Sequence, residues 1–118
     1  MAISTITVDC SDATALARFW ARALGWDVVP GASADFAAVG GPHRPADTPS
    51  LTFTRVPEPK ATKNRWHLDL DTDDPEAAVP HLESLGASVP RRVSEDGAGW
   101  TVLADPEGND FCIALHTR

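Results

Sequence analysis

The stretch RWHLDLDTDDPEAAV, residues 65–79, decides the fold, because its pattern changes half-way along. Its first half alternates polar and apolar side chains, with the polar ones at His67, Asp69 and Asp71. This period of two predicts a strand with one polar and one apolar face. In the second half, aspartates followed by Pro75 and two alanines predict the start of a helix. We therefore expect a strand followed directly by a helix, with a histidine and two carboxylates on one face.

The same order of elements occurs earlier in the chain. Residues 3–10 alternate like a half-buried strand, and an apolar stripe that begins at Leu16 predicts a helix that ends at Gly25. The second helix should end at Gly86, with a bend or an early end at Pro80. Three extended runs follow each helix, at 26–30, 35–40 and 51–56, and again at 87–93, 99–105 and 110–116. The sequence therefore predicts two βαβββ units of nearly equal length.

The composition is that of one globular domain. The chain has 118 residues, of which 42% are hydrophobic and 23% charged, and this is too short for two ordinary domains. Its 10 basic and 17 acidic residues give a formal net charge of −7. Such a charge is repelled by phosphate backbones and anionic lipid surfaces, so we expect no nucleic acid and no membrane as partners.

We expect neither a secretory signal peptide nor a membrane-spanning segment. Its first residues lack the basic flank and apolar run of a signal peptide, and no stretch approaches the ~20 apolar residues that cross a bilayer. The two cysteines, Cys10 and Cys112, lie in apolar strand-like runs far apart in sequence. Reduced thiols and a cytoplasmic location are the prediction, and a disulfide would require neighbouring strands.

Three segments carry a resemblance to a known family. They are DATALARFWARALGW (12–26), VPEPKATKNRWHLDLDTDD (56–74) and ADPEGNDFCI (104–113). On these segments the chain resembles the vicinal oxygen chelate superfamily, which includes glyoxalase I, extradiol dioxygenases, methylmalonyl-CoA epimerase and the bleomycin-binding resistance proteins. It looks most like the small glyoxalase-like proteins of actinobacteria.

The resemblance implies an α+β fold. Two βαβββ modules would form a curved mixed sheet around a cavity, with the helices on the outer face, and two chains would often form a homodimer. Within a single glyoxalase-like domain, residues 1–118, module one would span 1–57, a connector 58–65 and module two 66–118. Whether the modules pair within one chain or are exchanged between chains is open.

The resemblance also implies where a metal would bind. In the metal-dependent members, His or Glu on the first and last strands of each module holds a divalent cation. Here His67 matches the first strand of module two, Cys112 stands at the usual Glu position of its last strand, and Thr5 stands on the first strand of module one. Thr54, or as an alternative Thr52, is the position on the last strand of module one.

The side chains at these four positions are weak ligands for the divalent cations that the superfamily usually binds. Hard divalent ions prefer oxygen anions and zinc prefers several N, S or carboxylate ligands, so neutral threonines are weak replacements. Of the nearby carboxylates only Asp69 could share a small ion with His67, because strand spacing puts Asp71 roughly 13 Å from the histidine. We expect no metal of the family type and no other cofactor.

His67, Asp69 and Cys112 are the candidate catalytic residues. Histidine titrates near neutral pH, so His67 could act as a general base; the alternative is a histidine hydrogen-bonded within the sheet. Asp69 could orient it or bind a polar ligand group, or simply be solvated. Cys112 could be a nucleophile if His67 takes its proton, or it could be a small buried thiol.

Thr5, Thr54, Trp66 and Trp100 are the candidate ligand-binding residues. The two tryptophans adjoin the proposed groove and could stack on a flat ligand. The loop at residues 40–50 carries His43 and Arg44, which could meet an anionic ligand or be solvated. DPEGN, residues 105–109, has the composition of a tight turn, and Trp20 that of a core residue.

The resulting hypothesis is a metal-independent protein of the glyoxalase/bleomycin-resistance type that binds a small organic ligand. The alternative is a lyase or isomerase that uses His67 as general base. A metal-dependent glyoxalase or dioxygenase is a third hypothesis, which the missing carboxylates oppose. The sequence leaves the ligand or substrate open.

Overall fold

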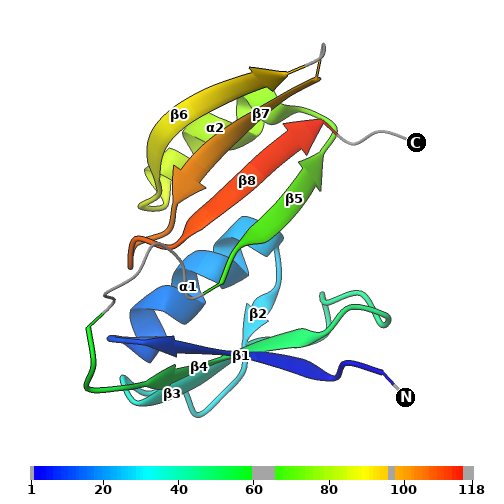
Figure 1. Cartoon of the computed structure of the whole chain (residues 1–118). Helices are drawn as coiled ribbons and strands as arrows, with labels where there is room; N and C mark the ends of the chain where they lie inside the picture. The colour runs from blue at the N-terminus through cyan, green and yellow to red at the C-terminus, as the bar shows by residue number, and fades with distance from the viewer. Residues whose placement is uncertain (1, 60–65, 96–97, 116–118) are drawn as a thin grey trace. The chain divides into compact units, whose positions relative to one another are not determined.

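The computed structural model describes residues 2–59, 66–95 and 98–115. The chain divides into two compact units, Met1–Ala61 and Thr62–Arg118, and each has the order βαβββ (Figure 1). The first unit contains β1 (Thr5–Cys10), α1 (Ala13–Leu24), β2 (Asp27–Val28), β3 (Phe36–Gly40) and β4 (Ser50–Arg55). The second contains β5 (Leu68–Thr72), α2 (Pro75–Ser84), β6 (Ser88–Glu95), β7 (Ala98–Ala104) and β8 (Asp110–Leu115).

The two sheets have the same topology. Their strand orders are β1-β4-β3-β2 and β5-β8-β7-β6, so the first and last strands of each unit are neighbours. These neighbours, β1 with β4 and β5 with β8, are parallel, and the other pairs are antiparallel. The predicted α+β class and the repeated βαβββ order are confirmed.

Helix α1 ends at Gly25, as the sequence predicts, and its first turn is capped by Asp12. The Asp12 carboxylate accepts a hydrogen bond from the Ala15 N–H at 3.2 Å, and Gly25 ends the helix with φ of 71°. The left-handed conformation favours glycine, so this cap suits the residue. Trp20 is 1% exposed and packs edge-on against Phe19, which confirms it as a core residue. Burial of a side chain of this size contributes a few kcal/mol to folding, about 1.5–3.

Helix α2 differs from its prediction at Pro80. Asp74 caps it through the Ala77 N–H at 3.1 Å, and the helix then continues through Pro80 to Ser84. The expected early end was wrong. Because Pro80 and Glu76 are both exposed, the carbonyl that proline leaves without a helical donor lies on the solvent side, where water can replace the lost bond.

The remaining differences concern strand length and burial. The run expected at 26–30 is only two residues of strand, because Gly31, with φ of 98°, turns the chain directly afterwards. The leucines of β5 are half-buried, not buried as expected for the core, while Asp69 and Asp71 are exposed. β5 is the edge strand of its sheet and has a single neighbour.

Within residues 2–59, 66–95 and 98–115, no helix is long and apolar enough to cross a membrane.

Candidate functional site

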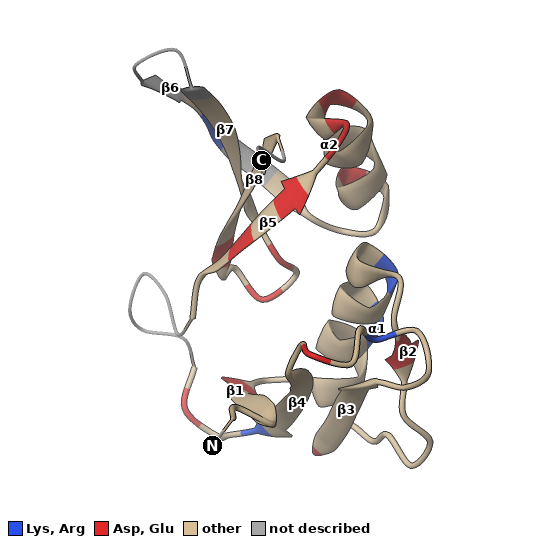
Figure 2. Cartoon of the chain, turned by 90° about the vertical axis from the view of Figure 1, so that its right-hand side faces the viewer, with Lys and Arg blue, Asp and Glu red and all other residues tan. Residues whose placement is uncertain are grey.

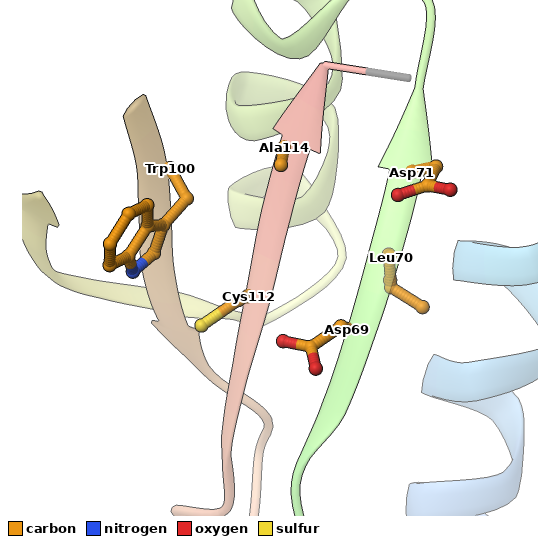
Figure 3. A pocket seen from close by; sticks show the side chains of 6 residues that line it. All are labelled: Asp69, Leu70, Asp71, Trp100, Cys112 and Ala114. Atoms are coloured by element: carbon orange, nitrogen blue, oxygen red, sulfur yellow. The ribbon is translucent and has the colours of Figure 1, made fainter. Parts of the chain in front are cut away.

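The parallel pairing of β5 and β8 brings the main candidate residues together. Asp69 and Cys112 are direct partners in this register. Both side chains line the same pocket from neighbouring strands (Figure 3). His67 precedes β5 and stands two residues before Asp69, so it falls on the same face. Strand pairing thus joins residues that are 45 positions apart in the sequence.

The contacts within this group are short. The Nε2 atom of His67 lies 3.2 Å from the Sγ atom of Cys112 and 3.7 Å from Oδ1 of Asp69. The Asp69 side chain is 86% exposed and that of His67 38%, whereas Cys112 is half-buried. We call His67, Asp69 and Cys112 the second-unit triad. The structure therefore brings all three candidate catalytic residues together.

A small pocket opens beside this triad on the same sheet (Figure 3). Its volume is about 250 Å³, and it is lined by Asp69, Leu70, Asp71, Trp100, Cys112 and Ala114. This is slightly below the roughly 300–1,000 Å³ of pockets that enclose a drug-sized ligand. Two carboxylates, one indole and one thiol give it an acidic and partly aromatic wall. Figure 2 shows acidic residues along β5.

Trp100 reaches the pocket and Trp66 does not line it. Trp100 lies on β7, next to β8, and pairs with Ala114 across the sheet. Ala114 is a lining residue that the sequence analysis missed. The alternation of β8 was a signal for it, because it follows Cys112 by two and so shares its face.

The turn at residues 105–109 sets the start of β8. Asp105 is 3% exposed, and its Oδ1 accepts hydrogen bonds from the backbone N–H of Glu107 at 2.9 Å and of Asn109 at 3.0 Å. The Asn109 amide donates to the same carboxylate. Gly108 takes a φ of 82°. The turn is as tight as predicted. It fixes the start of β8, the strand in which Cys112 pairs with Asp69.

The first unit has the same geometry with different side chains. β4 and β8 share one burial pattern, which aligns Cys112 with Thr52 and Ala114 with Thr54. The strand register agrees, since Thr7 pairs with Thr52 as Asp69 pairs with Cys112. The preference for Thr54 over Thr52 as the equivalent of Cys112 was therefore wrong, because the last strands are offset by 60 residues and the first strands by 62.

The equivalents of the second-unit triad are thus three threonines. Thr7 and Thr52 join their hydroxyls by a hydrogen bond of 2.7 Å, and the Thr5 hydroxyl is bonded to that of Ser50 at 2.9 Å. All are neutral groups engaged with other neutral groups. The first-unit positions at which the superfamily would hold a metal therefore do not fit a hard divalent cation, which prefers several anionic oxygens.

The loop at residues 40–50 is tied to its own unit. The Asp27 carboxylate bonds the ring Nδ1 of His43 at 2.8 Å and accepts from its backbone N–H at 3.3 Å. The Arg44 guanidinium donates to the carbonyl oxygens of Thr48 and Pro45. The two side chains that were considered for an anionic ligand thus have partners within the first unit.

Comparison with known families agrees with this architecture. The family model described as a glyoxalase-like domain matches residues 5–114. The chain belongs to this family. No functionally curated protein matches it in sequence.

Solved structures of the glyoxalase type share the fold. A glyoxalase/bleomycin resistance protein/dioxygenase family enzyme from Burkholderia phytofirmans PsJN superposes with a TM-score of 0.76 at 20% identity, covering 98% of both chains. A glyoxalase-related enzyme from Fulvimarina pelagi gives 0.71 at 19%, covering 97% of this chain and 87% of that one. The bleomycin-binding protein from Streptomyces verticillus, complexed with copper(II)-bleomycin, gives 0.60 at 17%, covering 99% and 98%. At these identities the similarity concerns the fold.

Proposed function

We propose that this glyoxalase-like protein binds a small organic ligand in the pocket beside β8 and needs no metal ion to do so. The observation that carries the proposal is the pocket lining, in which Trp100 faces the same space as Asp69 and Asp71. An indole provides a flat apolar surface for stacking, and two carboxylates favour a ligand with hydrogen-bond donors or a positive charge. The ligand class is therefore planar compounds that carry amine or amidine groups.

Two further features support a binding protein. The threonines at the superfamily's metal positions in the first unit leave no anionic ligand there for a catalytic hard cation. One solved structure of the same fold is a bleomycin-binding protein, so this scaffold can serve binding. A homodimer, a cytoplasmic location and the resemblance to actinobacterial proteins stay predictions.

The test is a screen of planar aromatic amines and amidines against the full chain in the presence of a chelator. Binding is detected by a rise in the unfolding temperature and then measured by calorimetry. Trp100→Ala should weaken the binding of a hit by about tenfold, as expected for the loss of a stacking partner worth roughly 1–2 kcal/mol.

Trp66→Ala is the matched control, because Trp66 is also half-buried and lies in the same unit, but outside the pocket lining. It should leave affinity unchanged. Equal losses in the two variants, or a hit that binds only when a metal ion is added, would contradict the proposal.

The second candidate function is a lyase or isomerase reaction in the same pocket. The 3.2 Å contact between His67 and Cys112 favours it, since an imidazole at this distance can take a proton from the thiol or from a bound ligand. A His67→Ala variant that binds the ligand normally but loses turnover would establish the enzyme. Normal turnover in this variant would exclude His67 as its base.

A further inference from the structure

A further pocket opens on the other face of the second-unit sheet. Its volume is about 250 Å³, and it is lined by Pro75, Arg92, Val93, Gly99, Trp100, Thr101 and Ile113. Ile113 directly follows Cys112 in β8, so the two side chains lie on opposite faces of the strand. Helix α2, which begins at Pro75, covers this face and packs against β8 (Figure 1). We call this the helix-side pocket; of the described residues, it shares only Trp100 with the pocket beside the second-unit triad.

A row of paired residues forms the floor of the helix-side pocket. Arg92 of β6 pairs with Thr101 of β7, and Thr101 pairs with Ile113 of β8. Residues directly opposite each other in antiparallel strands point to the same face, so these three side chains form a line across the sheet. Thr101 is 5% exposed and Ile113 3%. The pocket therefore reaches a buried floor that contains one hydroxyl group.

The guanidinium of Arg92 is the charged group of this pocket. It carries five N–H donors, of which Nη1 donates to the Thr101 hydroxyl at 3.2 Å. Among the residues that the structure describes, no carboxylate forms an ion pair with Arg92, and none lines the pocket. This is notable in a chain that has 17 acidic residues against 10 basic ones. The remaining donors of Arg92 are thus suited to an anion from outside the chain.

Gly99 keeps the helix-side pocket open. It stands two residues before Thr101 in β7, so a side chain at this position would lie on the same face. Among the described residues, a Cβ at Gly99 would meet only the Val93 carbonyl oxygen, at 3.6 Å, and no positive φ requires glycine here. Glycine inside a strand often marks a bulge or the close approach of a ligand. The register shift of this strand pair lies elsewhere, between Ser88 and Arg91, which favours a ligand.

We propose that the helix-side pocket binds a small organic carboxylate with an apolar body. The planar guanidinium of Arg92 matches the two oxygens of a carboxylate and can hold them in a bidentate pair. Pro75, Val93 and Ile113 offer apolar surface to the rest of the molecule. The volume is below that of pockets for drug-sized ligands, so the ligand is small. Inorganic phosphate has the charge but no apolar part to bury against these side chains.

The test is a titration of the isotopically labelled full chain with benzoate at pH 7, followed by NMR. We expect the backbone amide signals of Thr101 and Ile113 to shift and saturate, with a dissociation constant of about 1 mM or below. Benzamide, which has the shape of benzoate without its charge, and inorganic phosphate should each bind about tenfold more weakly. Shifts that do not saturate at ten times the expected constant, or benzamide binding as tightly as benzoate, would overturn the proposal.

Arg92→Gln tests the charged group. It removes the charged fork and keeps a side chain that can bond Thr101, so benzoate should bind about tenfold more weakly or worse. Arg91→Gln is the matched control, because it removes the same charge from the neighbouring position of β6, where Arg91 is exposed and outside the pocket lining. It should leave the affinity unchanged. Equal losses in the two variants would reduce the effect to net charge and refute the site.

Gly99→Leu tests the space. Its side chain should fill the pocket and abolish the benzoate shifts, while the other amide signals stay close to those of the parent. Benzoate binding at parental affinity in this variant would contradict the proposal. Arg92 is exposed, so Arg92→Gln should fold and decide the question even if Gly99→Leu does not fold.

This inference goes beyond the proposed function and concerns the opposite charge of ligand. The two proposals fail separately, because Asp69 and Asp71 line only the pocket beside the triad and Arg92 lines only the helix-side pocket. A screen of amines and amidines tests the first, and benzoate tests the second.

Discussion

At the scale of single residues, Asp105 illustrates how one buried carboxylate organises a turn. Its two oxygens accept hydrogen bonds from two backbone N–H groups and one side-chain amide, all within residues 107–109. Asp105→Ala would leave these buried donors without acceptors. We expect the free energy of unfolding to fall by about 2–3 kcal/mol, measured by urea denaturation.

Gly108→Ala serves as a comparison within the same turn. Gly108 has a φ of 82°, and no atom lies within 4 Å of the position that a Cβ would occupy. The cost should be limited to backbone strain of about 1–2 kcal/mol. If Asp105→Ala were no more destabilising than Gly108→Ala, the hydrogen bonds would not be the main contribution of Asp105.

The candidate site could be predicted residue by residue only in part. The alternation of residues 65–79 was sufficient to put His67 and Asp69 on one polar face. That Cys112 lies near them was inferred from the resemblance to a known family. The distance itself is known only from the pairing of β5 with β8 in the structure. The first strands of the two units are 62 residues apart in sequence and the last strands 60, and this difference of two decides between Thr52 and Thr54. Alternation alone cannot detect it, because both threonines lie on the same face of the strand.

At the scale of elements, the contact between β2 and the loop at residues 40–50 has a pH dependence. The hydrogen bond from the His43 side chain holds the pKa of the Asp27 carboxyl below its ordinary value, with smaller effects from the His43 backbone N–H and charge. A carboxyl whose pKa is lowered on folding stabilises the protein above its unfolded pKa near 3.9, and this contribution is lost as the pH falls through the lowered value.

Asp27→Asn should therefore lower the denaturation midpoint at pH 6, and the difference from the parent should shrink as the pH falls below about 4. Urea denaturation at several pH values measures it. Asp47→Asn removes the same charge from the loop that Asp27 contacts and controls for net charge. A difference that persists undiminished to pH 3 would show that the Asp27 carboxylate is not its source.

The elements themselves were the most predictable level. Helix capping acts within one turn of chain, so the sequence could predict the end of α1 at Gly25 and the start of α2 just before Pro75, and the structure confirms both. Pro80 was misjudged because the effect of a proline depends on whether water can reach the carbonyl that loses its donor. That exposure is set by the packing of α2 on its sheet, which the local sequence does not contain.

At the scale of the whole molecule, the repeat made the fold predictable. Two units with the same order of elements imply the same sheet topology, and both sheets do place their first and last strands side by side. The repeat could not predict the ligand or the side chains at the site. The same backbone holds three hydroxyls in the first unit and an imidazole, a carboxylate and a thiol in the second. A cavity shared by the modules stays a prediction.

The matching registers of β1–β4 and β5–β8 make the molecule suitable for transplantation. Replacing Thr5→His, Thr7→Asp and Thr52→Cys would copy the second-unit triad onto a backbone that already pairs Thr7 with Thr52. A structure of this triple variant should show an imidazole–thiol contact in the first unit like that of His67 with Cys112. Absence of the contact would mean that more than these three positions distinguishes the two units. Its presence would mean that the backbone of either unit can hold these three side chains together.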